Sequence, residues 1–356
     1  MESVVDRHLV SPTRVAAAAL AIIAATPVIA TETPQVVRSG TWTMILPLGL
    51  SADAAYLPDG NPLSAEKIAL GRLLYFDSRL SKDGTVSCAT CHVPARAFTD
   101  GRRVSPGVGQ QLGARNSPTI VNRLFSKEQF WDGRAADLED QVHGPLMNPL
   151  EMGMPSDAEV AARMRAITGY PPLFRRAFGD ERIEFRRIAE ALAAYERTVV
   201  SGDSPYDRYL AGDATALSDG QQRGLGVFLG RGRCSTCHVG FNFTDESYRN
   251  LGVGAGQPET DLGRYVVTKR DEDRGAFKTP TLRNVARTAP YMHDGSEATL
   301  LDVVEFYDRG GNANAWLSKD MQPLSLSAQE KRDLVAFMEA LSGPIVNGEA
   351  PAELPK

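Results

Sequence analysis

Hydrophobic residues recur at helical spacing in several stretches of the chain. Ser64, a good N-cap residue, precedes a stretch in which Ile68, Leu70 and Leu73 are apolar, and this predicts a helix that begins after Ser64. Residues 181–200 predict another helix, and the polar, proline-containing residues 201–205 after it are typical of a linker. No run of alternating apolar and polar residues indicates a substantial sheet. The pattern predicts a mainly α fold with long loops.

Two capping boxes mark further helix starts. Ser156-x-x-Glu159 and Ser327-x-x-Glu330 have the spacing at which a serine and a glutamate cap the first turn reciprocally. The second box opens a stretch whose apolar residues fall on one helical face, and these are Leu334, Phe337 and Leu341. We therefore expect a helix near the C-terminus.

One apolar run, residues 15–30, lies near the N-terminus. It is shorter and richer in alanine than a membrane span, which needs roughly 20 apolar residues. It ends in Val28-Ile29-Ala30, which resembles a cleavage site. We expect residues 1–30 to be a signal peptide for export to the periplasm, with no stable membrane span after cleavage. An uncleaved anchor is the alternative.

Length and charge narrow the classes of function. The 356 residues suit two domains of ordinary size. The net charge of −5 and the absence of any basic cluster longer than pairs such as Arg102-Arg103 argue against a nucleic-acid partner.

All four cysteines belong to two copies of the motif Cys-x-x-Cys-His. This is the attachment signal for c-type haem, in which two thioether bonds fix the porphyrin and the adjacent histidine binds the iron. Zinc or redox pairs are the alternative, but zinc needs tetrahedral ligand sets and the chain has only five histidines. We predict two covalently attached haems, one at Cys88, Cys91 and His92 and one at Cys234, Cys237 and His238.

The segments after the two motifs are similar, which indicates an internal repeat. Residues 98–100 match residues 243–245, residues 117–120 match 279–282, and residues 131–133 match 293–295. We expect two cytochrome c-like haem domains related by this repeat, at 31–205 and 206–345, with a flexible tail at 346–356.

One repeat position differs in its chemistry. Tyr307 occupies the position that matches Pro145, and a tyrosine phenolate ligates haem iron whereas proline does not. If this position faces the iron in both domains, the second haem is closed and the first is open to peroxide. A packed core aromatic is the alternative role for Tyr307, and Met292, Met321 and Met338 are rival ligands.

These residues and several longer motifs resemble the bacterial di-haem cytochrome c peroxidases and their relative MauG, which oxidises tryptophans in a partner protein. Besides both haem motifs, the resemblance rests on residues 115–119 (RNSPT), 130–134 (FWDGR), 148–152 (NPLEM) and 290–295 (PYMHDG). It implies a peroxidatic N-terminal haem and a C-terminal haem that stores or relays an electron. A small cytochrome c or cupredoxin would donate electrons, or a partner protein would be oxidised.

The resemblance also implies roles for individual residues. Trp131 would lie between the haems, and Tyr307 would be the distal ligand of the second haem, as tyrosine is in MauG. Gln141, Pro145 and Glu151 would line the peroxide pocket, with Glu151 as the acid–base group.

A calcium ion between the domains is also implied by the resemblance. The side chain of Asn116 and the backbone oxygens of Thr288 and Pro290 would hold it, and hard oxygen ligands suit calcium. Many of the peroxidases carry a histidine that blocks the first haem until the second is reduced, and here that position is Val108. Because valine cannot ligate iron, we expect a first haem that is open when fully oxidised. Val108 and Tyr307 place the chain nearer to MauG.

Three functions are compatible with the sequence: a hydrogen-peroxide-reducing enzyme, a MauG-like enzyme acting on a partner protein, and an electron-transfer cytochrome without catalysis. Val108 and Pro145, which leave the first iron without a sixth ligand, count against the third, as does Glu151. His143 lies two residues before Pro145, so we considered it as a ligand of the first iron. We expect instead that it faces solvent.

Overall fold

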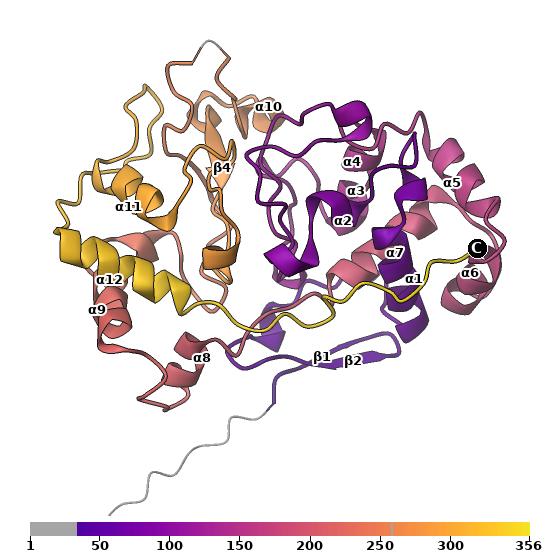
Figure 1. The fold of residues 1–356 in the computed structure, drawn as a ribbon, viewed down its shortest axis with the longest axis horizontal. Helices are drawn as coiled ribbons and strands as arrows, with labels where there is room; N and C mark the ends of the chain where they lie inside the picture. The colour runs from indigo at the N-terminus through magenta and orange to yellow at the C-terminus, as the bar shows by residue number, and fades with distance from the viewer. Residues whose placement is uncertain (1–33, 258) are drawn as a thin grey trace, which may run out of the picture. The chain divides into compact units, whose positions relative to one another are not determined.

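Two helices, α1 (Ala65–Phe76) and α7 (Phe185–Glu196), pack together at the centre of the N-terminal half of the computed structural model (Figure 1). The structure describes residues 34–257 and 259–356, so the signal peptide predicted at 1–30 lies outside the described residues. The Ser64 hydroxyl accepts a hydrogen bond from the Lys67 N–H, which confirms the predicted start of α1.

The helix predicted over 181–200 is shorter than expected. Glu184 precedes α7 in an extended conformation, and Arg197 ends it. The preceding residues form a loop because the Asp180 carboxylate accepts hydrogen bonds from Arg182 and Arg187. These ionic contacts compete with the continuous helix that propensity alone favours.

The described chain is mainly helical, as predicted, with two short two-stranded antiparallel sheets. The other α-helices are α2 (Cys88–Cys91), α3 (Leu138–Gln141), α4 (His143–Met147), α5 (Asp157–Arg165), α6 (Tyr170–Phe178), α8 (Pro205–Leu210), α9 (Asp219–Leu229), α10 (Tyr265–Thr268), α11 (Leu300–Asp308) and α12 (Ala328–Glu339). Short 3₁₀ turns occupy Ala52–Ala54, Ser78–Leu80, Pro94–Arg96, Val108–Gln110, Arg123–Phe125, Cys234–Thr236, Asp271–Asp273 and Val285–Arg287. Strand β1 (Val36–Ser39) pairs antiparallel with β2 (Trp42–Ile45), and β3 (Tyr248–Asn250) pairs antiparallel with β4 (Ala276–Lys278).

Both predicted capping serines begin helices. The hydroxyl of Ser327 and the carboxylate of Glu330 cap each other's backbone N–H groups at the start of α12, which is a complete capping box. At α5 the Ser156 hydroxyl accepts from the Glu159 N–H, and no return bond from the glutamate side chain forms. The sequence signal therefore located both helix starts, although the capping box at Ser156 has only one of its two hydrogen bonds.

Two hydrophobic clusters fill the two halves of the described chain. The N-terminal cluster is built around α1, α5, α6 and α7 and includes the fully buried Leu74, Tyr75 and Phe174. The C-terminal cluster is built around α9, α11 and α12, and Phe337 is its most buried residue. Figure 1 shows α9, α11 and α12 grouped apart from α1–α7, so each half has its own core.

Matching segments of the two halves adopt the same backbone conformation. Asn122 and Asn284 both lie in the left-handed region, with φ of 62° and 59°, and asparagine tolerates this region better than most residues. Phe130 and Met292 have φ of 68° and 71°. Each of these last two residues lies inside a small bridged turn, formed in one case by residues 129 and 135 and in the other by 291 and 297.

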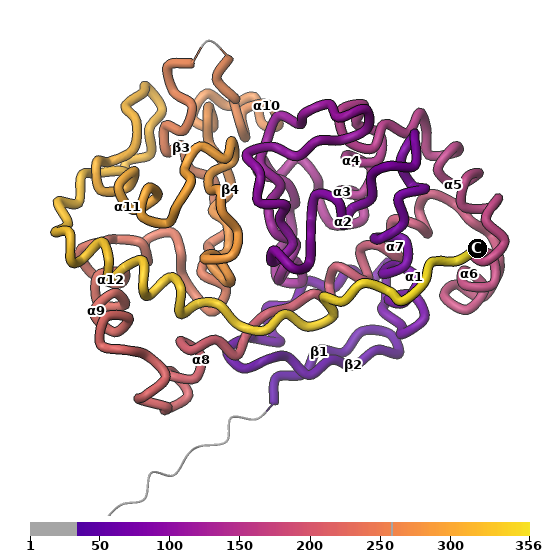
Figure 2. The backbone as a smooth tube through the Cα atoms, in the orientation of Figure 1, coloured from indigo at the N-terminus to yellow at the C-terminus, as the bar shows by residue number. Residues whose placement is uncertain are grey.

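The C-terminal segment contacts the N-terminal half. Figure 2 shows residues beyond α12 running across to α6. Val346 N–H donates to Val200 O, Tyr195 Oη donates to Asn347 O at 3.1 Å, and Arg79 donates to Pro355 O at 2.8 Å. The segment predicted as a flexible tail, 346–356, thus makes hydrogen bonds to the N-terminal half that its sequence pattern does not encode.

An ion pair buried in the fold joins α8 to the C-terminal half. The guanidinium of Arg283 donates to both carboxylate oxygens of Asp207 at 2.7 and 2.9 Å, and the two side chains are 1% and 2% exposed. Asp207 also caps Ser204 at the start of α8. Within the described ranges, none of the helices has the length and apolar character needed to cross a membrane.

Candidate haem-binding site

A cavity of about 680 Å³ is lined by residues of both halves. Helix α2 carries both cysteines of the first Cys-x-x-Cys-His motif and His92 follows it directly, whereas the second motif begins in the 3₁₀ turn Cys234–Thr236 and ends just after it. The motif residues that line the cavity are Cys88, Cys91, His92, Cys234, Cys237 and His238. None of the four cysteines forms a disulfide. The structure therefore directs both predicted attachment sites into the same cavity.

The two motif histidines are oriented in the same way. His92 Nδ1 lies 3.2 Å from Phe98 O, and His238 Nδ1 lies 2.9 Å from Phe243 O. A carbonyl at Nδ1 fixes the tautomer that leaves Nε2 available for a metal. Burial lowers the pKa of both imidazoles, which favours the neutral form that a metal needs.

This donor set fits two haems. Each motif offers two unpaired cysteines and an oriented, neutral histidine on the wall of a cavity whose lining is largely apolar. Bound haem supplies an iron centre that binds peroxide or exchanges electrons, according to its axial ligands.

The three residues predicted for the peroxide pocket line the cavity together. Gln141 ends α3, Pro145 lies in α4, and Glu151 follows in the next loop. Asn148 Nδ2 donates to Glu151 Oε1 at 2.7 Å. Burial raises the pKa of Glu151, although this hydrogen bond and the charge of Arg134 oppose the shift. A carboxyl with a raised pKa beside a reacting oxygen suits general acid–base chemistry.

The loop that carries Val108 packs against the Glu151 segment. Val108 N–H donates to Glu151 O at 2.8 Å, and the Val108 side chain is buried in the N-terminal cluster. A Cβ at Gly107 would lie 2.1 Å from Leu150 O, so this close approach requires glycine. Gly107 lines the cavity, whereas Val108 does not contribute to its lining.

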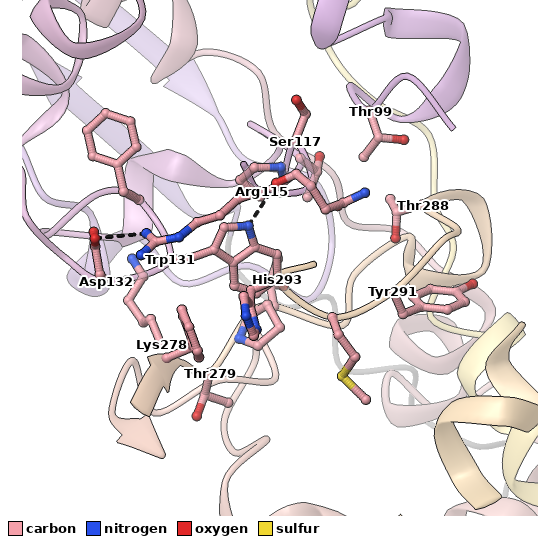
Figure 3. Close-up of a pocket in the computed structure, with 18 of the residues that line it drawn as sticks. Thr99, Arg115, Ser117, Trp131, Asp132, Lys278, Thr279, Thr288, Tyr291 and His293 are labelled. Carbon is pink, nitrogen blue, oxygen red and sulfur yellow. Dashed lines mark hydrogen bonds and ion pairs between the residues drawn. The ribbon is translucent and has the colours of Figure 1, made fainter. Parts of the chain in front are cut away.

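Trp131 is held by groups from both halves of the chain. Its indole Nε1 donates to Asn116 O at 2.9 Å, and its backbone oxygen accepts from Lys278 N–H in β4 at 2.8 Å. Figure 3 shows Trp131 beside His293 on the cavity wall, with the Trp131 hydrogen bond drawn as a dashed line. The ring of His293 stacks on Phe277, with centroids 3.6 Å apart. The indole is thus rigidly placed where the two halves meet.

Tyr307 lies in α11 and lines the cavity. Burial raises the pKa of its phenol, since the phenolate is disfavoured in an apolar environment without a cation. Met292, Met321 and Met338, the rival ligands, line the same cavity.

His143 is directed away from the cavity. It begins α4, its side chain is 55% exposed, and its Nε2 lies 3.3 Å from the Asp157 carboxylate. It does not contribute to the cavity wall, so the expectation that it faces solvent is confirmed.

The residues predicted to hold calcium also face this cavity. Asn116, Thr288 and Pro290 all line it, and Figure 3 shows Thr288 beside Tyr291. Asn116 Nδ2 donates to Arg102 O at 2.9 Å, which leaves the amide oxygen directed elsewhere. An amide oxygen with backbone carbonyls is a donor set that fits calcium.

Sequence reasoning missed several charged residues of the cavity wall. Arg123, Glu196 and Lys278 line it, and Glu196 and Lys278 are only 7% and 6% exposed. The internal repeat could have drawn attention to Arg123, because a charged residue stands there at the position where the second half has the apolar Val285.

Comparisons with known proteins agree with this site. The family described as "Di-haem cytochrome c peroxidase" matches residues 65–215. The methylamine utilization protein MauG of Methylorubrum extorquens is 44% identical over 80% of each chain. The cytochrome c551 peroxidase of Pseudomonas aeruginosa is 40% identical, over 80% of this chain and 81% of its own. A solved MauG-like protein associated with microbial copper homeostasis is 38% identical with a TM-score of 0.76, over 81% of this chain and 93% of that one.

The fold, the cavity and these relatives define the class of the protein: it is a haem peroxidase, an oxidoreductase with two haems. More specifically, the chain belongs to the di-haem cytochrome c peroxidase family, and MauG proteins are among its similar relatives.

Proposed function

We propose that this protein is a periplasmic c-type peroxidase that reduces hydrogen peroxide at the N-terminal haem. Electrons would pass from a small cytochrome c or cupredoxin through the C-terminal haem. The observation that carries the proposal is the cavity wall on which Gln141, Pro145 and Glu151 lie together with His92, and on which partial burial raises the pKa of the Glu151 carboxyl. An electron-transfer cytochrome has no need of a half-buried acid–base group at its cofactor site.

The proposed roles follow from the contacts of each side chain. The Glu151 carboxylate would take a proton from one oxygen of peroxide and return it to the other, which would leave as water, and the two haems would supply the two electrons that the O–O cleavage consumes. Asn148 holds the carboxylate in place through the 2.7 Å hydrogen bond. Trp131, fixed from both halves of the chain, lies in the path of electrons between the two haem sites.

The architecture proposed with this function is two cytochrome c-like domains, at 31–205 and 206–345, related by the internal repeat. Support comes from the paired left-handed Asn122 and Asn284 and from the two equivalent bridged turns. A calcium ion held by Asn116, Thr288 and Pro290 would join the domains next to Trp131.

Low-temperature EPR of the fully oxidised protein, with and without peroxide, tests this proposal. We expect one high-spin haem, open above His92, and one low-spin haem ligated by His238 and Tyr307, both changing when peroxide is added. Two low-spin haems that are inert to peroxide until reduced would contradict the open first site.

A MauG-like oxidation of residues in a partner protein is the second candidate. Tyr307 on the cavity wall favours it, as do the MauG relatives at 44% and 41% identity. Steady-state consumption of peroxide with reduced cytochrome c separates the two, since a MauG-like enzyme is expected to turn over poorly with that donor. Rapid turnover would favour the peroxidase.

A further inference from the structure

Arg123 lies on the cavity wall with its guanidinium unsatisfied. The side chain is 14% exposed, and its only ion pair within the described ranges joins Nη2 to Glu246 at 3.6 Å. Its buried Nε has no hydrogen-bond partner there. A guanidinium carries five N–H donors, and burying them without acceptors costs free energy. An acceptor that occupies the cavity is the natural partner.

Other arginines of the same wall are paired. Arg115 donates to the Asp261 carboxylate at 2.7 and 2.9 Å, and it also bonds Asp132. Arg249 donates to Asp245 at 2.7 and 3.0 Å. These arginines form hydrogen-bonded ion pairs with carboxylates, whereas the Nε of Arg123 has no hydrogen-bond acceptor within the described ranges.

The position of Arg123 distinguishes the two haem sites. Val285, its match in the internal repeat, also lines the cavity and cannot bind an anion. Glu196, a nearby carboxyl of the wall, forms no ion pair with Arg123 within the described ranges, and burial raises its pKa to about 7 although the charges of Arg197 and Arg123 oppose the shift. The acceptor for Arg123 is therefore expected from the cofactor of the N-terminal half.

We propose that Arg123 binds a carboxylate of the porphyrin attached at Cys88 and Cys91. The inference deepens the proposed function and rests on it, since it assumes c-type haem at the first motif. Porphyrin carboxylates are planar anions that match the fork of a guanidinium.

The pairing extends into the second half of the chain. Glu246 lies 3.6 Å from Arg123 and 3.0 Å from the ammonium of Lys278 in β4. Lys278 N–H in turn donates to the backbone oxygen of Trp131. Arg123, Glu246 and Lys278 thus alternate in charge from the first haem toward Trp131, and Arg123 acts as a positioning residue that also tunes the first haem.

Redox titration of the holoprotein tests this inference, with absorption and EPR used to separate the two haems. Loss of the cation in Arg123→Gln should leave the haem carboxylate unbalanced, stabilise ferric iron and lower the first potential. We expect the reduced-to-oxidised ratio of the first haem at a fixed potential to fall roughly tenfold, or about 59 mV for one electron. Arg123→Lys should restore part of the shift.

A second variant should shift the potential of the first haem in the opposite direction, which distinguishes an effect of charge from an effect of misfolding. Glu246→Gln removes the charge that competes for Arg123 and should raise the potential of the first haem. Arg186→Gln, which loses the same charge from a side chain that is 80% exposed, is the control and should change neither potential.

The outcomes separate this inference from the function on which it rests. A haem count by pyridine haemochrome that is below two per wild-type chain would overturn both. Two attached haems, with a first potential that is unchanged in Arg123→Gln and Glu246→Gln, would overturn the inference alone. A shift confined to the second haem would overturn it as well, because Arg123 would then serve the other site.

Discussion

Replacing Glu151 with glutamine probes the chemistry of the first site most directly. Glutamine keeps the size of the side chain and an oxygen that accepts from Asn148 Nδ2, so the 2.7 Å hydrogen bond and the cavity wall should persist. Only the ability to accept and return a proton is lost. General acid–base help of this kind contributes roughly 10²- to 10⁴-fold, which corresponds to about 3 to 5 kcal/mol of transition-state stabilisation.

The raised pKa of Glu151 adds a pH signature. The base form must be present to accept the first proton, so the wild-type rate should fall as the pH drops through this pKa. Because burial raises the pKa, that fall is expected above the pH at which an ordinary glutamate titrates. The Glu151→Gln variant should lack this limb of the profile.

Stopped-flow mixing of the oxidised protein with peroxide measures the rate across pH. Glu159→Gln, at an exposed position of α5, is the matched control and should behave as the wild type. Haem spectra before mixing check that both haems are intact. An unchanged rate and pH profile in Glu151→Gln would remove this carboxyl from the mechanism.

Three further predictions concern stability and the second haem. Asp207→Asn should destabilise the fold by about 3 to 5 kcal/mol, because it leaves the buried guanidinium of Arg283 without its counterion; an unchanged melting temperature would contradict this. Tyr307→Met should raise the potential of the second haem, since a thioether favours ferrous iron more than a phenolate does; an unaltered potential and EPR spectrum would mean that Tyr307 is not a ligand. Calcium removal with a chelator should weaken the spectral coupling of the two haems upon peroxide addition, because the proposed ion at Asn116 adjoins the carbonyl that holds Trp131; metal analysis that finds no bound calcium would exclude this.

Local sequence signals located the features that depend on neighbouring residues. Ser64 and Ser327 cap the predicted helices because N-cap bonds reach only three residues along the chain. The Cys-x-x-Cys-His motifs specify their chemistry in five consecutive residues, so a haem could be predicted at each without tertiary information. In the internal repeat, Tyr307 occupies the position equivalent to Pro145, and both residues line the cavity.

Features that depend on residues far apart in the chain could not be predicted from the sequence. The segment beyond residue 345, predicted to be flexible, is hydrogen-bonded to the Tyr195 side chain and the Val200 backbone, and no local sequence pattern predicts these partners. The helix expected from residue 181 begins only at Phe185, because the Asp180 carboxylate binds two nearby arginines and holds the preceding residues in a loop.

The sequence by itself predicted two haem sites and the mainly helical class, because motif spacing and capping are encoded in short stretches, and it led us to expect that only the first of the two haems is open. Only the tertiary structure decided which charges in the cavity are balanced. Arg115 and Arg123 look alike in the sequence, yet one is bound by Asp261 and the other keeps its Nε without a partner. The difference arises because desolvation and pairing depend on which distant side chains the fold brings to the same wall.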